Sequence, residues 1–174
     1  MKQVKWFERS FSFNSEQNIF PSLIERLRGT PARLEEKMKT VPQGILAIKP
    51  DNTWSIKENI GHLTDLEPLW QGRLEDITNG EKELRPTDLA NKKTDEANHN
   101  AQSIDELLSS FRQIRAQTVA MLEKVDEQTL FRSALHPRLK TPLRTMDLFL
   151  FTAEHDDHHL ARITEIVKIL DTDK

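Results

Sequence analysis

Residues 148–170 read LFLFTAEHDDHHLARITEIVKIL. Positions at steps of three and four residues share one side of a helix here, because an α-helix turns about 100° per residue. They are Leu148, Thr152, His155, His159, Ile163, Ile166 and Leu170. Such a stripe predicts a long helix with one buried face, and we expect it to begin with Thr141 as N-cap and Pro142 in the first turn.

The same periodicity recurs in three further segments, at about residues 16–40, 55–78 and 103–125. The last of these opens with Ser103 and Glu106, whose spacing is typical of a capping box at a helix start. Four long helices of similar length predict an all-α fold, an antiparallel four-helix bundle. The chain length suits one domain, and we place it over residues 1–174.

Three features interrupt the helical pattern. The stretch Gly29-Thr30-Pro31 predicts that the first helix is either kinked or split, with Thr30 as N-cap of a second piece. Pro68 predicts a bend in the second helix because it cannot donate a backbone hydrogen bond. Residues 79–102 are polar and long for a connection, and such segments are often functional lids or mobile loops.

Composition excludes several classes of protein. The 25 basic and 28 acidic residues leave a formal net charge of −3 without a basic run, so we expect no nucleic-acid partner. The chain has no cysteine, which excludes disulfides, thiolate metal sites and a catalytic thiol. Neither a signal-peptide pattern nor a membrane-spanning apolar run is present, so we expect a cytoplasmic protein without a membrane partner.

Histidines interrupt the apolar stripe of the last helix. His155 and His159 lie about 40° apart and one turn from each other, so both can face one object inside the bundle. His158 lies about 100° from His159, toward the outside. Burying an imidazole is costly unless its nitrogens are satisfied, and a divalent metal would satisfy both rings.

A third ligand has to come from another helix. His62 is the candidate, because it lies on the flank of the apolar face of the second helix. A histidine in such a position is also common as a packing residue that binds nothing. Three imidazoles would leave a coordination position open, which is typical of catalytic metal sites. Imidazole ligands suit several metals, with zinc as the default and nickel as an alternative.

Acidic residues near these histidines are candidates for catalysis. Glu58 and Asp65 lie about one turn before and after His62, and Asp156 flanks the inner stripe of the last helix. Each could fix an imidazole through its free N–H or act as a general base. The alternative is that they are solvated or form ion pairs along the helix.

His136 is a fourth catalytic candidate, because its segment should run close to the start of the last helix. The alternative is an ordinary histidine of a surface loop. His99, in the polar connection, carries no functional signal. We interpret Trp54 and Trp70 as packing residues and not as platforms for a substrate.

The sequence contains WSIKENIGHLTDLE at residues 54–67 and AEHDDHHLARI at residues 153–163. These two motifs resemble the signatures of the DinB/YfiT-like family of metal-dependent proteins. KWFER at residues 5–9 and RLRGTPA at residues 26–32 also resemble one branch of that family, so the similarity covers almost the whole chain. The resemblance implies a four-helix bundle with one metal on His62, His155 and His159, and often a homodimer.

The resemblance also implies relatives that transfer or isomerise groups with low-molecular-weight thiols. We therefore expect a metal-dependent enzyme that acts on a small molecule by thiol (S-)transfer or hydrolysis. A metal-stabilised binding or stress-response module without turnover is the alternative. A pocket that reaches the open position of the metal would favour the enzyme, because an interaction module has no need of one.

Overall fold

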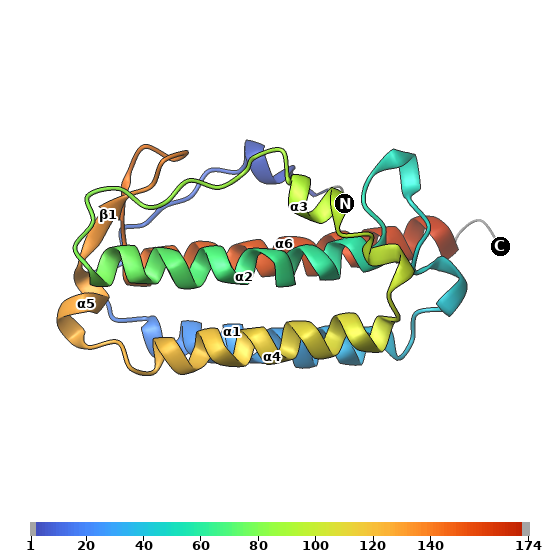
Figure 1. Ribbon diagram of the computed structural model, residues 1–174, viewed down its shortest axis with the longest axis horizontal. Coiled ribbons are helices and arrows are strands. Elements are labelled where there is room, and N and C mark those ends of the chain that lie inside the picture. Colours follow the sequence, from blue (N-terminus) through green and yellow to red (C-terminus); the bar gives the residue numbers. More distant parts are fainter. Residues whose placement is uncertain (1–2, 172–174) are drawn as a thin grey trace.

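The computed structural model describes residues 3–171, except for the side chains of Asp51 and Asp171. Within these residues, four long helices lie side by side (Figure 1): α1 (Phe20–Met38), α2 (Ile56–Thr78), α4 (Ile104–Leu122) and α6 (Thr145–Asp171). The predicted helical bundle is confirmed. The single domain over residues 1–174 stays a prediction, and residues 1–2 and 172–174 lie outside the described part.

The order of the helices around the bundle depends on one long connection. Both α1 and α2 pack against α4 and α6. Residues 79–102 return along the bundle from the end of α2 to its start, where the Lys57 ammonium donates to the Gln102 carbonyl at 2.5 Å. As a result α2 and α4 run in the same direction, and each is antiparallel to α1 and α6 (Figure 1).

Shorter elements connect the long helices. Two strands pair antiparallel, with Ala134 opposite Leu143, and Glu83 of the long connection bridges to Leu135. The short elements are the 3-10 turns η1 (Trp6–Glu8), η2 (Gln43–Ile45), η3 (Pro50–Asn52) and η4 (His99–Ala101), the helices α3 (Lys92–Glu96) and α5 (Glu127–Phe131), and the strands β1 (Ser133–Leu135) and β2 (Pro142–Arg144). None of the helices in the described residues is long and apolar enough to span a membrane.

The predicted start of the last helix at Thr141 and Pro142 is wrong. Pro142 opens β2 instead, a position that proline tolerates because the first residue of a strand need not donate to the ladder. The helix begins at Thr145. Asp147 in its first turn accepts a hydrogen bond from the backbone N–H of Arg144 at 3.1 Å, which caps the start. The predicted capping box of α4, with Ser103 and Glu106, is confirmed.

The first helix is not split, and Thr30 is not an N-cap. Pro31 lies inside the continuous helix α1. A proline leaves the carbonyl four residues earlier without its helical partner. That carbonyl, of Leu27, accepts a hydrogen bond from Nη1 of Arg115 on α4 at 3.3 Å. The contact with Arg115 therefore replaces the hydrogen bond within the helix that Pro31 cannot donate.

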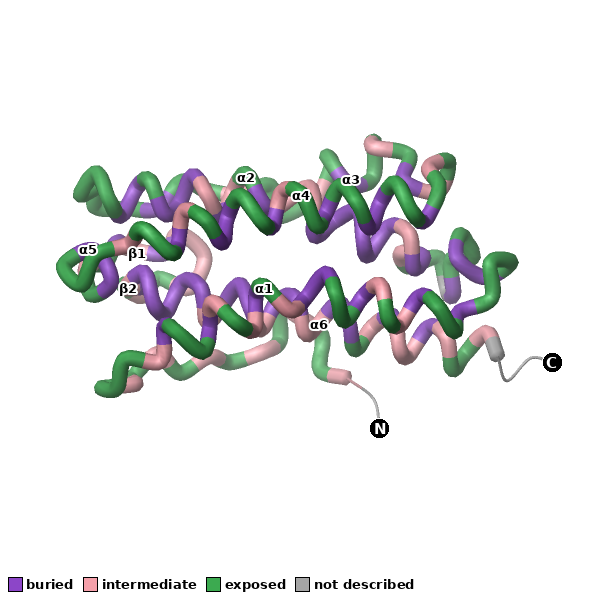
Figure 2. Tube along the Cα trace, turned by 90° about the horizontal axis from the view of Figure 1, so that it is seen from below, coloured by how far each residue is buried: buried purple, intermediate pink, exposed green. Residues whose placement is uncertain are grey.

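A buried polar layer divides the apolar core into two halves. Trp70 and Phe149 belong to one half, and Phe111 and Ile163 to the other. Figure 2 shows the buried positions facing inward along the long helices. Between the halves, all four long helices contribute buried polar side chains to the layer: Thr30 (α1), Glu67 (α2), Arg115 and Thr118 (α4) and Asp156 (α6).

Arg115 is the centre of this polar layer. Its Nε donates to Glu67 at 2.8 Å, its Nη2 donates to Asp156 at 3.0 Å, and only 1% of it is exposed. Burial alone would lower the pKa of Arg115, but the two carboxylates outweigh that effect and raise it. The guanidinium stays charged and joins α4 to α1, α2 and α6.

Candidate metal centre

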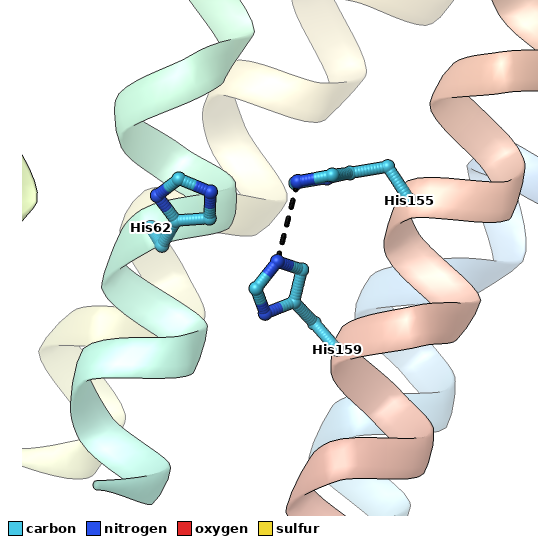
Figure 3. Close-up of side chains that lie close together, drawn as sticks. All are labelled: His62, His155 and His159. Carbon is cyan, nitrogen blue, oxygen red and sulfur yellow. Dashed lines mark hydrogen bonds between the residues drawn. The ribbon is translucent and has the colours of Figure 1, made fainter. Parts of the chain in front are cut away.

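Three buried histidines meet between α2 and α6. His62 comes from α2, and His155 and His159 come from successive turns of α6 (Figure 3). One ring nitrogen of each lies within 4.8 Å of the other two, and Nε2 of His155 is 3.2 Å from Nε2 of His159. His158 is adjacent in sequence but lies outside this cluster. The structure thus brings together the three residues that the spacing singled out.

Asn59 orients the ring of His159. Its side-chain amide donates to the Ser55 carbonyl at 2.8 Å, so its Oδ1 is directed at Nδ1 of His159, 2.8 Å away. An amide oxygen only accepts, so Nδ1 of His159 carries the proton and Nε2 keeps its lone pair. That lone pair faces the cluster.

Thr94 performs the same role for His62. Its hydroxyl donates to the Asp65 carboxylate at 2.9 Å and therefore accepts from Nδ1 of His62, also at 2.9 Å. Burial alone would raise the pKa of Asp65, but hydrogen bonds from His99 and Thr94 outweigh it and lower that pKa. The ionised carboxylate fixes the ring through the threonine, so Asp65 acts on His62 indirectly.

His99 belongs to this arrangement, although the sequence analysis assigned it no signal. It is buried, and its Nε2 lies 2.8 Å from Oδ2 of Asp65. Its ring packs so closely on α2 that a Cβ at Gly61 would lie 2.3 Å from Cγ of His99. The glycine beside His62 is therefore needed for this contact. The long connection, residues 79–102, therefore packs against the site and supplies Thr94 and His99 to it.

The donor set fits a divalent cation. Burial lowers the pKa of His62 to about 4, and burial with the neighbouring imidazoles lowers those of His155 and His159 well below the usual value. All three rings are therefore neutral at pH 7, as metal ligation requires. Nδ1 of His155 has no hydrogen-bond partner among the described residues. The Nε2 atoms of His155 and His159, which face each other at 3.2 Å, are the atoms that would bind a cation.

A cavity of about 710 Å³ reaches the three histidines. Three tryptophans line it beside the histidines: the ring of Trp54 lies 4.6 Å from His62, and those of Trp6 and Trp70 lie 4.9 and 5.8 Å from His155. Interpreting Trp54 and Trp70 as packing residues alone is therefore incomplete, because both also line the cavity. Trp6, in η1, is a site residue that the helical pattern did not indicate.

With this geometry established, comparison with known proteins identifies the family. A sequence model of the DinB superfamily matches residues 26–163. The chain belongs to the DinB superfamily. Among curated proteins, none matches the chain.

Solved structures share the fold of this DinB protein. YfiT from Bacillus subtilis, a probable metal-dependent hydrolase with an unusual four-helix bundle topology, has a TM-score of 0.76 and 22% identity over 94% of this chain and 93% of its own. A Streptococcus pneumoniae protein has a TM-score of 0.68 and 14% identity over 90% and 93% of the chains. The colibactin self-resistance protein ClbS, in complex with a dsDNA, has a TM-score of 0.65 and 13% identity over 88% and 98%. The absence of a nucleic-acid partner stays a prediction for the DinB chain.

The structure places the four catalytic candidates in different surroundings. Glu58 accepts from the backbone of Ser55 at 2.9 Å and pairs with Lys49 at 2.7 Å, which makes it part of a helix cap. Asp156 belongs to the buried polar layer, and Asp65 holds Thr94 and His99 as described above. The cavity lining includes none of these three carboxylates.

His136 does line the cavity. It is 2% exposed, so the interpretation as a surface-loop histidine is wrong. The hairpin of β1 and β2 folds back over the bundle and buries it, since the ring packs edge-on against Phe151 at 5.4 Å. Short-range sequence patterns do not indicate this folding back of the chain.

Replacing Thr94 by valine is expected to weaken metal binding about 10–100-fold, which is typical for loss of an outer partner of a ligating histidine. Valine keeps the shape but removes the hydroxyl that accepts from His62 and donates to Asp65. Competition against a chromophoric chelator measures the affinity. Thr40→Val is the matched control, because that hydroxyl is exposed and, among the described residues, bonds only the Lys37 carbonyl. Equal affinities of the two variants would contradict the role of Thr94.

Proposed function

We propose that this DinB protein is a metal-dependent enzyme that acts on a small molecule bound beside His62, His155 and His159. The observation that carries the proposal is the cavity of about 710 Å³, which lies in the size range of ligand pockets and reaches all three histidines. A metal-stabilised binding or stress-response module would need no such cavity. It remains the alternative function.

The three histidines would hold the ion, with zinc as the first expectation and nickel as the second. Three neutral ligands would leave the full charge of a divalent ion, which would supply Lewis-acid activation of a water or thiol nucleophile. The likeness to YfiT supports hydrolysis, and the motif resemblance supports transfer to a low-molecular-weight thiol.

Residues of the chain itself prepare the site for this chemistry. Asn59 and Thr94 keep the lone pairs of His159 and His62 directed at the cluster. Trp6 and Trp54 cover the histidines with apolar surface, which limits water and strengthens electrostatic interactions at the reacting atoms. Asn59 and Thr94 thus orient the histidines that would hold the ion, and the tryptophans enclose the space in which the substrate would bind.

Turnover assays distinguish the reactions. Metal-loaded protein is incubated with a panel of esters and amides without thiol, and separately with low-molecular-weight thiols plus a panel of electrophiles. Turnover in either panel that disappears in His159→Ala supports the enzyme and identifies its nucleophile. Absence of turnover in both panels, from protein that holds its metal, overturns the enzyme and supports the binding module. The homodimer and the cytoplasmic location stay predictions, tested by light scattering and fractionation.

A further inference from the structure

Two arginines without an acidic partner lie in the cavity, three turns of α2 beyond His62. Arg73, on α2, is 1% exposed, and its Nη2 has no hydrogen-bond partner in the described part of the chain. Arg138, between β1 and β2, has a buried Nη2 that is likewise unpartnered. Both residues line the cavity, and neither forms a salt bridge with any described carboxylate. A buried guanidinium in this condition is costly.

The carboxylate that attracts Arg73, that of Asp76, is already paired with another arginine. Asp76 is held by Arg85, whose Nη2 donates to it at 2.7 Å and whose Nε donates at 3.0 Å. Burial lowers the pKa of Arg73 to about 10; Asp76 opposes this effect, while Arg138 and Arg85 add to it. Arg73 is still charged at pH 7, and no described carboxylate forms a direct ion pair with it.

His136 lies beside Arg73, and the two side chains lack a shared hydrogen-bond acceptor. Its Nδ1 accepts from the backbone N–H groups of Arg138 and Leu139, both at 3.2 Å. Burial, together with Arg73 and Arg138, lowers the pKa of His136 to about 4, so the ring is neutral and its one proton is on Nε2. Nε2 lies 3.1 Å from Nη1 of Arg73, so two donors face each other. An acceptor bound to one side, within hydrogen-bond distance of both nitrogens, would satisfy both.

We propose that Arg73, Arg138 and His136 form a subsite for an oxyanion, a carboxylate or phosphate group of the small molecule on which the enzyme acts. Guanidinium groups bind both anions through charge-assisted hydrogen bonds. That the anion belongs to the substrate rests on the proposed function. The subsite itself rests only on the unpartnered donors.

The position of the subsite relative to the histidines indicates the length and shape of the ligand. Arg73 follows His62 by eleven residues, an axial rise of about 16 Å along α2. Trp70 lies between the two ends, with its ring 5.6 Å from Cζ of Arg73 and 5.8 Å from the ring of His155. The ligand is therefore elongated, with an anionic group at the arginines, an apolar middle beside Trp70 and its reacting group at the histidines.

Anion binding to metal-free protein tests the subsite. Inorganic phosphate and glutarate are titrated separately at constant low ionic strength, with tryptophan fluorescence as the signal because Trp70 contacts Arg73. We expect saturable binding of at least one anion, and the tighter of the two identifies the group. Arg138→Gln is expected to weaken it about tenfold or more, since hydrogen bonds to charged groups are strong. Arg112→Gln removes an equal charge from an exposed pair with Glu35 and leaves binding unchanged.

The outcomes separate this inference from the proposed function. Wild-type protein that binds neither anion, or Arg138→Gln that binds as tightly as Arg112→Gln, overturns the subsite. Because the anion titrations use metal-free protein, that result does not change the interpretation of the turnover assays, which use metal-loaded protein. Anion binding without turnover in either panel overturns the enzyme and keeps the subsite. Thermal unfolding of each variant verifies that it is folded, and Arg73→Gln, if folded, is expected to repeat the loss.

Discussion

Alanine at His155 is expected to lower the affinity for a divalent metal more than about a hundredfold, because loss of a direct ligand exceeds the 10–100-fold cost of losing an outer partner. Its ring nitrogen is one of three that meet in the cluster. Alanine at His158 is expected to leave the affinity nearly unchanged. The His158 ring lies outside the cluster and packs at 5.5 Å from Trp6.

Metal content after dialysis and chelator competition measure this difference. Thermal unfolding gives a second measurement, since a ligand at a thousand times its dissociation constant stabilises the folded state by about 4 kcal/mol. Metal should therefore raise the melting temperature of wild type and His158→Ala, and fail to raise that of His155→Ala. A protein that keeps its metal after loss of His155 and releases it after loss of His158 would refute the assignment.

Methionine at Arg115 is expected to lower the free energy of unfolding by about 3–5 kcal/mol, the cost of breaking a buried ion pair by removing one partner. The change leaves Glu67 and Asp156 buried without their shared cation, and it leaves the Leu27 carbonyl without a donor. Methionine keeps a comparable length, so the electrostatic loss dominates. Urea denaturation at pH 7 measures the effect.

Arg112→Met is the matched control on the same helix. Arg112 pairs with Glu35 on the surface, and exposed pairs contribute only about 0–1 kcal/mol. Adding Glu67→Gln and Asp156→Asn to Arg115→Met should recover part of the loss, because both unpaired charges are removed. Equal destabilisation by Arg112→Met and Arg115→Met would show that the buried polar layer does not act as an ion-pair network.

Much of the fold could be predicted from local pattern. Helices repeat every 3.6 residues, so apolar spacing located all four long helices, and the spacing of Ser103 and Glu106 located the capping box. Their ends were less well defined, because residues near Pro142 pair with β1 in preference to starting a helix. The relation of His155 to His159 was also local, since two residues four apart on one helix keep their geometry in any fold.

The tertiary structure decided what surrounds these histidines. Thr94 and His99 reach the site only because the long connection returns along α2, and Trp6 reaches it because the chain before α1 lies against α6. Arg73 resembles any surface arginine of a helix until the hairpin that carries His136 buries it. Such contacts join residues far apart in sequence, and their geometry depends on the path of the connections, which carry no periodic signal. The sequence by itself therefore determined the helices and the paired histidines, and only packing between elements decided the partners and the cavity.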